Sequence, residues 1–269
     1  MTPFQAVVLA LVQAVTEFLP VSSSGHLILL PRLLGWGDQG LEFDIATNSG
    51  TLIAVAIYFR RELVRMARGF GASFSSAQRA CNPDARLLWA LAWGTVPAGL
   101  AGLLIKDFVA GQARNVPLIA VNAIVYGTLL GLADWRGRKD RQEGEIGRRE
   151  ALLIGCAQAL ALVPGTSRSG VTMTAALLLG FSRPAAARFA FLLSIPIGLL
   201  VGVKQVFDAL RGMPLGVTPQ AIAIGIGVSA IAGYAVIAGL LAWLRRHPLT
   251  VFAGYRIALG LVLLAFFSR

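Results

Sequence analysis

Two short polar stretches contain the side chains of this chain that could do chemistry. Residues 13–26 (QAVTEFLPVSSSGH) combine an amide, a carboxylate, hydroxyls and an imidazole, on Gln13, Glu17, Ser22, Ser23, Ser24 and His26. Residues 164–172 (PGTSRSGVT) place a guanidinium among hydroxyls, on Ser167, Arg168, Ser169 and Thr172. An apolar run precedes Arg168, and an arginine at hydrocarbon depth costs roughly a few kcal/mol or more. Arg168 therefore needs a partner or a ligand.

A guanidinium, hydroxyls and the free N–H groups of helix N-termini together predict a phosphate site. Glu17 would repel a bare phosphate, which indicates a bridging cation, and Mg²⁺ or Ca²⁺ prefers such oxygen ligands. Gln13 lies four residues before Glu17 and so shares its helical face. If the two stretches face each other, one cavity gathers all these groups.

Simpler roles are open for the same side chains. Glu17 and Arg168 could form a structural ion pair between the two stretches, and the serines could cap helices. His26 could hydrogen-bond within its own loop, and Gln13 could join packed helices. A lone charged residue in the last apolar segment, Arg256, could either snorkel to the interface or pair.

The composition indicates a membrane protein. Of the 269 residues, 56% are hydrophobic and 14% charged, whereas a soluble domain has about 25% charged residues. The net charge of +11 comes from basic residues in short loops between apolar runs, which is the positive-inside pattern, so a nucleic-acid partner is not expected. The two cysteines, Cys81 and Cys156, lie too far apart in the sequence to suggest a disulfide framework or a metal site.

Six stretches are long enough to cross about 30 Å of hydrocarbon as helices of about 20 residues. They are residues 43–59, 86–105, 116–135, 184–204, 218–244 and 250–267. Two further apolar regions, 2–35 and 149–181, are interrupted by Pro/Ser/Gly clusters at 19–26 and 164–170, which predicts two re-entrant helix pairs. The expected fold is therefore all-α and polytopic, a single integral membrane domain over residues 1–269.

The two interrupted regions resemble each other. Residues 13–25 align without gaps with residues 158–170, and five of the thirteen positions are identical. Three candidate spans follow each region, and because three is odd the second copy must enter the membrane from the opposite side. The sequence thus predicts an inverted-topology repeat, residues 1–135 and 149–269, whose breaks meet at a shared site.

The basic residues predict the orientation of the chain. The loops at 60–86 and 136–149 carry six each, and Arg245 and Arg246 follow the fifth span, whereas the alternate loops carry Lys106, Arg114, Lys204 and Arg211. The richer loops are expected to be cytoplasmic. Both termini and the first re-entrant pair then lie toward the outside, and the second pair enters from the cytoplasm.

Residues 13–26 resemble the Glu/Gln-x-x-x-Glu and Pro-x-Ser-Ser-x-Gly-His region of the undecaprenyl-diphosphate phosphatases of the bacitracin-resistance type. Residues 164–172 resemble their Pro-Gly-x-Ser-Arg-Ser-x-x-Thr signature, and the resemblance runs the length of the chain. It implies a multi-pass enzyme of the bacterial inner membrane that removes the terminal phosphate of undecaprenyl diphosphate, the lipid carrier for peptidoglycan and other envelope polymers. Bacitracin resistance follows because the drug sequesters the diphosphate. The resemblance also implies an outward-facing site and contact with membrane lipids. A homodimer is compatible with this resemblance.

The resemblance also implies roles for individual residues. Glu17 would assist the metal or the proton transfers, and Gln13 occupies the first, variable acidic place, where many members have Glu, so metal affinity would be weaker. The nucleophile would be Ser23 or a water, with His26 as the proton carrier, since its ordinary pKa is near 6.5. The diphosphate-binding set would be Ser22, Ser167, Arg168, Ser169 and Thr172.

A different class of function stays open at this point. Broken helices in an inverted repeat are also transporter architecture, so a lipid-carrier flippase or an ion-coupled transporter is the alternative. Such a protein would not need a reactive serine and histidine beside a phosphate site. A purely structural subunit fits less well, because it gives no reason for Glu17 and Arg168.

Overall fold

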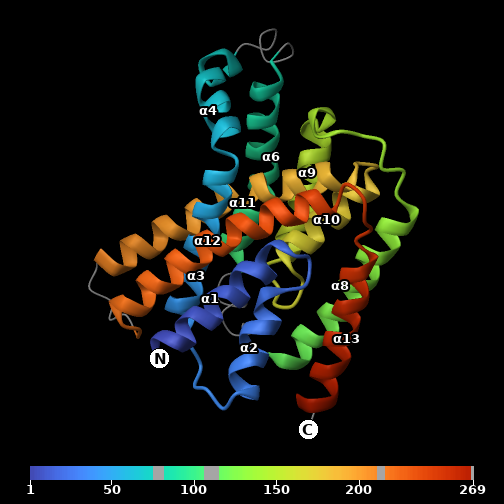
Figure 1. Ribbon diagram of the computed structural model, residues 1–269. Helices are drawn as coiled ribbons and strands as arrows, with labels where there is room; N and C mark the ends of the chain where they lie inside the picture. Colours follow the sequence, from blue (N-terminus) through green and yellow to red (C-terminus); the bar gives the residue numbers. More distant parts are fainter. Residues whose placement is uncertain (75–81, 106–114, 211–215, 268–269) are drawn as a thin grey trace.

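The chain forms a bundle of helices joined mostly by short loops in a computed structural model (Figure 1). The structure describes residues 1–74, 82–105, 115–210 and 216–267. Within these ranges no β-strand forms, and the one β-bridge joins Arg141 to Phe181. Of the basic residues counted in the loops, Arg79, Lys106, Arg114 and Arg211 lie outside the described residues, as do Cys81 and the side chain of Lys204.

The helices follow one another with few long connections. They are α1 (Pro3–Phe18), α2 (Ser23–Leu33), α3 (Leu41–Tyr58), α4 (Arg60–Gly69), α6 (Pro83–Leu104), α8 (Val116–Arg136), α9 (Arg148–Leu160), α10 (Arg168–Leu178), α11 (Arg183–Leu210), α12 (Pro219–Trp243) and α13 (Thr250–Phe267). Two short 3₁₀ helices, η1 (Gly71–Phe74) and η2 (Glu143–Glu145), complete the set. The prediction of an all-α fold is confirmed.

In the described part of the chain, four helices are long and apolar enough to cross a membrane: α6, α8, α12 and the Arg183–Gly202 part of α11. They match four of the six predicted spans. The other two predicted spans are also helices, but α13 falls among the shorter apolar helices, and α3 carries Glu42 and Asp44 in its first turn. The structure therefore gives an all-helical protein with four helices of the membrane-spanning type.

Both predicted breaks interrupt a helix. α1 ends at Phe18 and α2 begins at Ser23, while α9 ends at Leu160 and α10 begins at Arg168, so the new helices start inside the predicted polar clusters. The residues just before α2 and α10 are Ser22, with φ 75° and ψ 98°, and Ser167, with φ 69° and ψ 112°. Positive φ is uncommon outside glycine. These two serines occupy equivalent positions in the alignment of residues 13–25 with 158–170.

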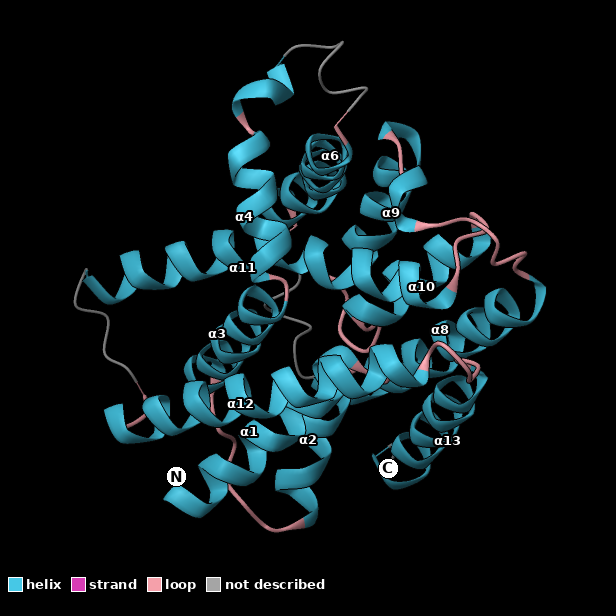
Figure 2. Ribbon diagram, turned by 45° about the horizontal axis from the view of Figure 1, so that its top comes forward, coloured by secondary structure: helices cyan, strands magenta, loops and turns pink. Residues whose placement is uncertain are grey.

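The first half of the chain packs extensively on the second. α1 lies against α12, α9 lies against α6, and α8 lies beside α13, as both views show (Figures 1 and 2). The contacts are close: a Cβ atom added to Gly155 would collide with the Gly94 carbonyl, and one added to Gly260 would lie 2.6 Å from the Ala120 carbonyl oxygen. Small residues at such crossings are typical of membrane helices, which gain stability from close backbone approach.

Two hydrophobic clusters position the elements that carry the polar breaks. The larger one surrounds α10 and α11, where Met173, Leu177 and Phe189 are fully buried. A smaller one, which includes Ile28, Ile119 and Leu263, joins α2 to α8 and α13. The first break is thus held against the last helix of the chain, and the second break against the main core.

Candidate active site

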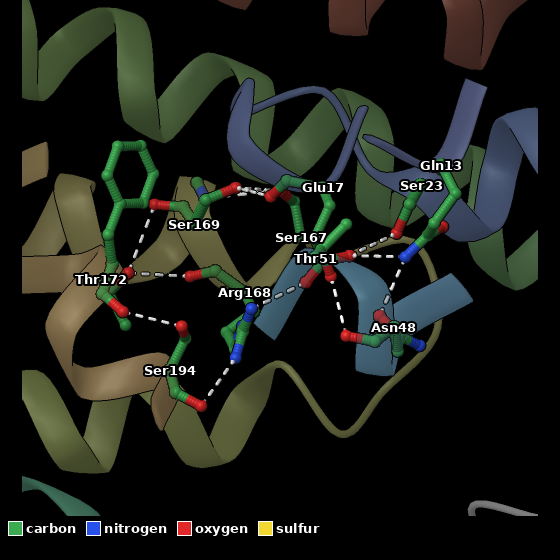
Figure 3. A network of polar contacts seen from close by, with 12 residues as sticks. Gln13, Glu17, Ser23, Asn48, Thr51, Ser167, Arg168, Ser169, Thr172 and Ser194 are labelled. Carbon is green, nitrogen blue, oxygen red and sulfur yellow. Dashed lines mark hydrogen bonds and ion pairs between the residues drawn. The ribbon is translucent and has the colours of Figure 1, made fainter. Parts of the chain in front are cut away.

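The two loops meet at an ion pair. Arg168 Nη2, at the start of α10, lies 2.7 Å from Oε1 of Glu17, near the end of α1 (Figure 3). The two side chains are 25% and 12% exposed, so water screens the pair only partly. Arg168 is therefore paired with Glu17 in this state, so the two charged side chains expected to meet are in contact. A buried pair of this kind is costly to break from one side.

The second carboxylate oxygen of Glu17 faces the candidate nucleophile. Ser23 Oγ donates to Glu17 Oε2 at 3.0 Å, and Gln13 Nε2 donates to the same oxygen at 3.1 Å. Gln13 Nε2 also donates to Asn48 Oδ1 of α3 at 2.7 Å. A hydroxyl hydrogen-bonded to a carboxylate has the geometry of a nucleophile with its general base.

A cavity of about 430 Å³ opens at this junction. Its polar end contains both residues of the ion pair together with Ser22, Ser23, Ser24, Asn48, Thr51, Ser167 and Ser194. The rest of its lining is mostly apolar, with Ile45, Leu52, Leu162, Ile197 and Val201, and also includes a second acidic residue, Asp44. A volume of this size is typical of small-molecule sites. The polar end can hold a phosphate or diphosphate, and the apolar wall can contact a hydrocarbon.

Two residues of the predicted diphosphate-binding set do not line this cavity. Ser169 is 5% exposed, and its Oγ lies 3.0 Å from the Glu17 carbonyl oxygen and 3.2 Å from that of Leu19. Thr172 is 1% exposed and donates to the Arg168 carbonyl one turn earlier in α10, at 2.8 Å. Ser169 therefore joins the two loops and Thr172 binds its own helix, so the prediction that they contact substrate does not match this geometry.

His26 also lies away from the cavity. Its Nδ1 is 2.8 Å from the Ser22 carbonyl oxygen, and its Nε2 is 2.6 Å from the Tyr255 hydroxyl of α13. Both ring nitrogens are engaged by these groups, so the ring does not exchange a proton directly with Ser23 in this arrangement. The ionisable side chain that contacts Ser23 in this geometry is Glu17.

The sequence alone did not identify Arg256 as part of the site. This residue of α13 is fully buried, and its Nη2 donates to the carbonyl oxygens of Gly165 at 2.9 Å and Thr166 at 2.8 Å. Its Nη1 reaches the Pro20 carbonyl oxygen at 3.4 Å. Arg256 thus ties both loops to one helix. Its charge within an apolar segment was the available signal, because such residues usually have a specific partner.

Residues 6–262 match the family model described as "Bacitracin resistance protein BacA". The chain belongs to this family. It is 51% identical over 265 residues to "Undecaprenyl-diphosphatase" of Magnetococcus marinus, covering 97% of this chain and 98% of that protein. It is 51% identical over 267 residues to "Undecaprenyl-diphosphatase 2" of Stutzerimonas stutzeri, with 98% of both chains covered. A third relative, "Undecaprenyl-diphosphatase" of Thioalkalivibrio sulfidiphilus, is 48% identical over 264 residues, again over 98% of both chains.

The oxygen atoms at the site can be examined as ligands for the expected divalent cation. Among the described residues, no group of three His, Cys, Asp or Glu side chains is placed to hold a metal ion. Gln13 Oε1, however, is buried without a hydrogen-bond partner in the described part of the chain, beside Glu17. Mg²⁺ commonly binds through one or two carboxylates and the phosphates of its substrate. Of the two predicted metal residues, Glu17 lines the cavity, whereas Gln13 is 1% exposed and does not line it.

Proposed function

We propose that the cavity between the two loops is where this chain dephosphorylates undecaprenyl diphosphate to undecaprenyl phosphate. The family and the three relatives are named for bacitracin resistance and for this activity, and the chain is an enzyme of that class. The observation that carries the assignment of the site is the contact between Ser23, Glu17 and Arg168 at the polar end of an otherwise largely apolar cavity.

In the proposed reaction, Ser23 Oγ attacks the terminal phosphorus while Glu17 Oε2 accepts the hydroxyl proton. The Ser23 O–P bond forms, the bond from that phosphorus to the bridging oxygen breaks, and undecaprenyl phosphate leaves. Arg168 exchanges Glu17 for the phosphoryl oxygens and stabilises their charge, which is the main form of catalysis in phosphoryl transfer. Glu17 passes the Ser23 proton to the oxygen of the departing undecaprenyl phosphate and is again a carboxylate. It then accepts a proton from water, whose oxygen attacks the phosphoserine phosphorus; the Ser23 O–P bond breaks, Glu17 returns the proton to Ser23, and phosphate is released.

The proposal includes a divalent cation, Mg²⁺ or Ca²⁺. Glu17 and Gln13 Oε1 would hold it together with the diphosphate, and when bound it would offset part of the negative charge of the substrate. The unpartnered buried oxygen of Gln13 supports this part of the proposal.

We also propose that the fold is an inverted-topology repeat of six spans and two re-entrant pairs, divided as residues 1–135 and 149–269. The matching dihedral angles of Ser22 and Ser167 support it, as do the equal lengths of α2 and α10. The reciprocal packing of α1 on α12 and of α9 on α6 supports it further. A homodimer stays a prediction.

The proposed orientation has the arginine-rich loops in the cytoplasm and the site reached from the outer face of the bacterial inner membrane. The basic segments 60–74 and 137–147 lie toward the top of Figure 1, whereas both chain ends and residues 34–40 lie toward the bottom, which supports this orientation. The apolar wall of the cavity supports a prenyl tail that stays within the lipid.

The decisive experiment is release of phosphate from undecaprenyl diphosphate by the purified chain in detergent, with Mg²⁺, with Ca²⁺ and with EDTA. We expect release with a metal, loss in the Arg168→Ala variant, and a phosphoserine at residue 23 in peptides from a quenched reaction. Arg61→Ala, on the exposed surface of α4, is the control. Absence of release under every metal condition, combined with lipid translocation in vesicles, would favour the flippase alternative.

A further inference from the structure

The loop before Ser23 lacks a capping hydrogen bond that the loop before Arg168 has. In the second loop, Ser167 Oγ accepts a hydrogen bond from the Gly170 backbone N–H at 3.2 Å and so caps α10. Ser22, at the equivalent position, makes no such capping bond among the described residues, although its φ is equally positive. A non-glycine residue at positive φ persists only where its surroundings hold it. The positive φ of Ser22 must therefore be stabilised by contacts with other residues.

His26 supplies the first of these contacts. Its Nδ1 lies 2.8 Å from the Ser22 carbonyl oxygen, the atom that precedes the Ser23 peptide nitrogen. Because a carbonyl can only accept, the Nδ1 atom must carry the proton. The corresponding position in the second repeat is Val171, which cannot form this bond. The bond therefore belongs to the loop that carries the nucleophile.

Tyr255 holds His26 in place. Its hydroxyl is 2.6 Å from His26 Nε2, and the two rings are stacked, with centroids 5.6 Å apart and planes 6° apart. With the proton on Nδ1, the Nε2 atom of the neutral ring has a free lone pair, and the Tyr255 hydroxyl donates to it. The partner of one ring nitrogen thus fixes the tautomer at the other.

We propose that Tyr255 is a positioning residue for the reaction, because it anchors the His26 ring at Nε2 and so keeps Nδ1–H on the Ser22 carbonyl, which fixes the direction of Ser23. The inference rests on the proposed function only for its kinetic part. Tyr255 does not line the cavity, so it acts on the speed of phosphoryl transfer and leaves substrate binding unchanged. The residue beside it, Arg256, braces the same loop at Pro20.

The structural part can be tested without any activity. The chain has two histidines, and the second, His247, is exposed, so a His247→Gln variant labelled with ¹⁵N-histidine reports on His26 alone. At about pH 8, above the ordinary imidazole pKa, we expect a single tautomer with the proton on Nδ1. Tyr255→Phe, which keeps the stacked ring, is expected to shift the Nε2 resonance, because that nitrogen loses its hydrogen-bond donor, and to broaden the Nδ1 resonance as the ring becomes less firmly held. A proton on Nε2 in the parent, or an unchanged spectrum in the variant, overturns the proposal.

The kinetic part uses the same substitution in a chain with both histidines. Loss of one hydrogen bond of this kind is expected to lower kcat for phosphate release by about threefold to tenfold, with KM unchanged. In a His26→Ala background, Tyr255→Phe is expected to have no further effect, because Tyr255 acts through His26. Tyr234→Phe, a partly exposed tyrosine of α12 that packs on Tyr58, is the matched control.

The outcomes of these experiments distinguish failure of the positioning role from failure of the proposed function. A wild-type kcat in Tyr255→Phe, or additive losses in the double variant, overturns the positioning role. If the parent chain releases no phosphate at all, the proposed function fails, while the tautomer measurement still decides whether Tyr255 controls His26.

Discussion

Replacing Glu17 by glutamine separates the two roles that the structure gives this carboxylate. The substitution keeps the size of the side chain and leaves an oxygen that can accept the Ser23 hydrogen bond, but it removes the charge that pairs with Arg168 and the ability to take a proton. A general base contributes about 10²- to 10⁴-fold to a rate. We therefore expect kcat for phosphate release to fall by about that factor.

The effect on stability is expected to be much smaller. Breaking a fully buried pair costs about 3–5 kcal/mol, but Arg168 is 25% exposed and its Nη1 lies 3.4 Å from the Ser194 carbonyl oxygen. A loss of about 1–3 kcal/mol is therefore expected. Thermal unfolding in detergent measures this loss on the same preparation that is used for kinetics.

A second ion pair of the chain provides the control. Glu62 Oε1 lies 3.1 Å from Arg188 Nη2, with side chains 20% and 31% exposed, and neither residue lines the cavity. Glu62→Gln is expected to leave kcat unchanged and to lower stability by no more than Glu17→Gln, because Arg188 keeps a second partner, Glu143 Oε2, 2.8 Å from its Nε. If Glu17→Gln retains kcat within about threefold of wild type while losing stability like the control, the pair is structural and Glu17 is not the base.

Four further substitutions, and Ser24→Ala as a control for the first, test other parts of the structure. Ser23→Ala is expected to lower phosphate release by at least about 100-fold, whereas Ser24→Ala, which changes a residue bonded to Gly165 N at 3.3 Å, retains most of it. Gln13→Glu adds a carboxylate where an unpartnered oxygen lies, so the metal concentration for half-maximal release should fall about tenfold or more. Arg256→Met leaves buried carbonyl groups unpaired and should lower the free energy of unfolding by about 3–5 kcal/mol, measured by thermal or denaturant unfolding. Gly155→Val drives a side chain into the Gly94 backbone and should cost about 1–3 kcal/mol in the same measurement.

The parts of the fold that follow local pattern were predictable. Apolar length identified the four long helices, and the Pro/Ser/Gly clusters located both loops. Glu17 and Arg168 were recognised because charges in apolar segments are costly, and the alignment of the two loops brought them together before any distance was known. For these residues, residue type and spacing in the sequence were enough to predict that they belong to one site.

Side-chain direction was not predictable in the same way. Ser167 and Ser169 are two residues apart in one motif, yet the first lines the cavity and the second turns toward the Glu17 carbonyl. His26 and Arg256 are placed by contacts with segments that are about 90 to more than 200 residues away in the chain. No periodicity within a segment encodes such contacts, because they depend on where α13 docks after the other helices have packed.

The packing of α1 on α12 has a consequence for the order of events during synthesis. The Ser229 hydroxyl of α12 donates to the Ala10 carbonyl at 3.1 Å, and Gly233 admits the Phe18 ring, so the face of α1 that leads to Glu17 is completed by a helix made more than 200 residues later. A nascent chain that has only its first half in the membrane holds Glu17 without the arginine that pairs with it. The proposed catalytic centre is therefore among the last parts of the molecule to form, and we expect a chain that stalls before α12 is inserted to be inactive although it already contains Ser23.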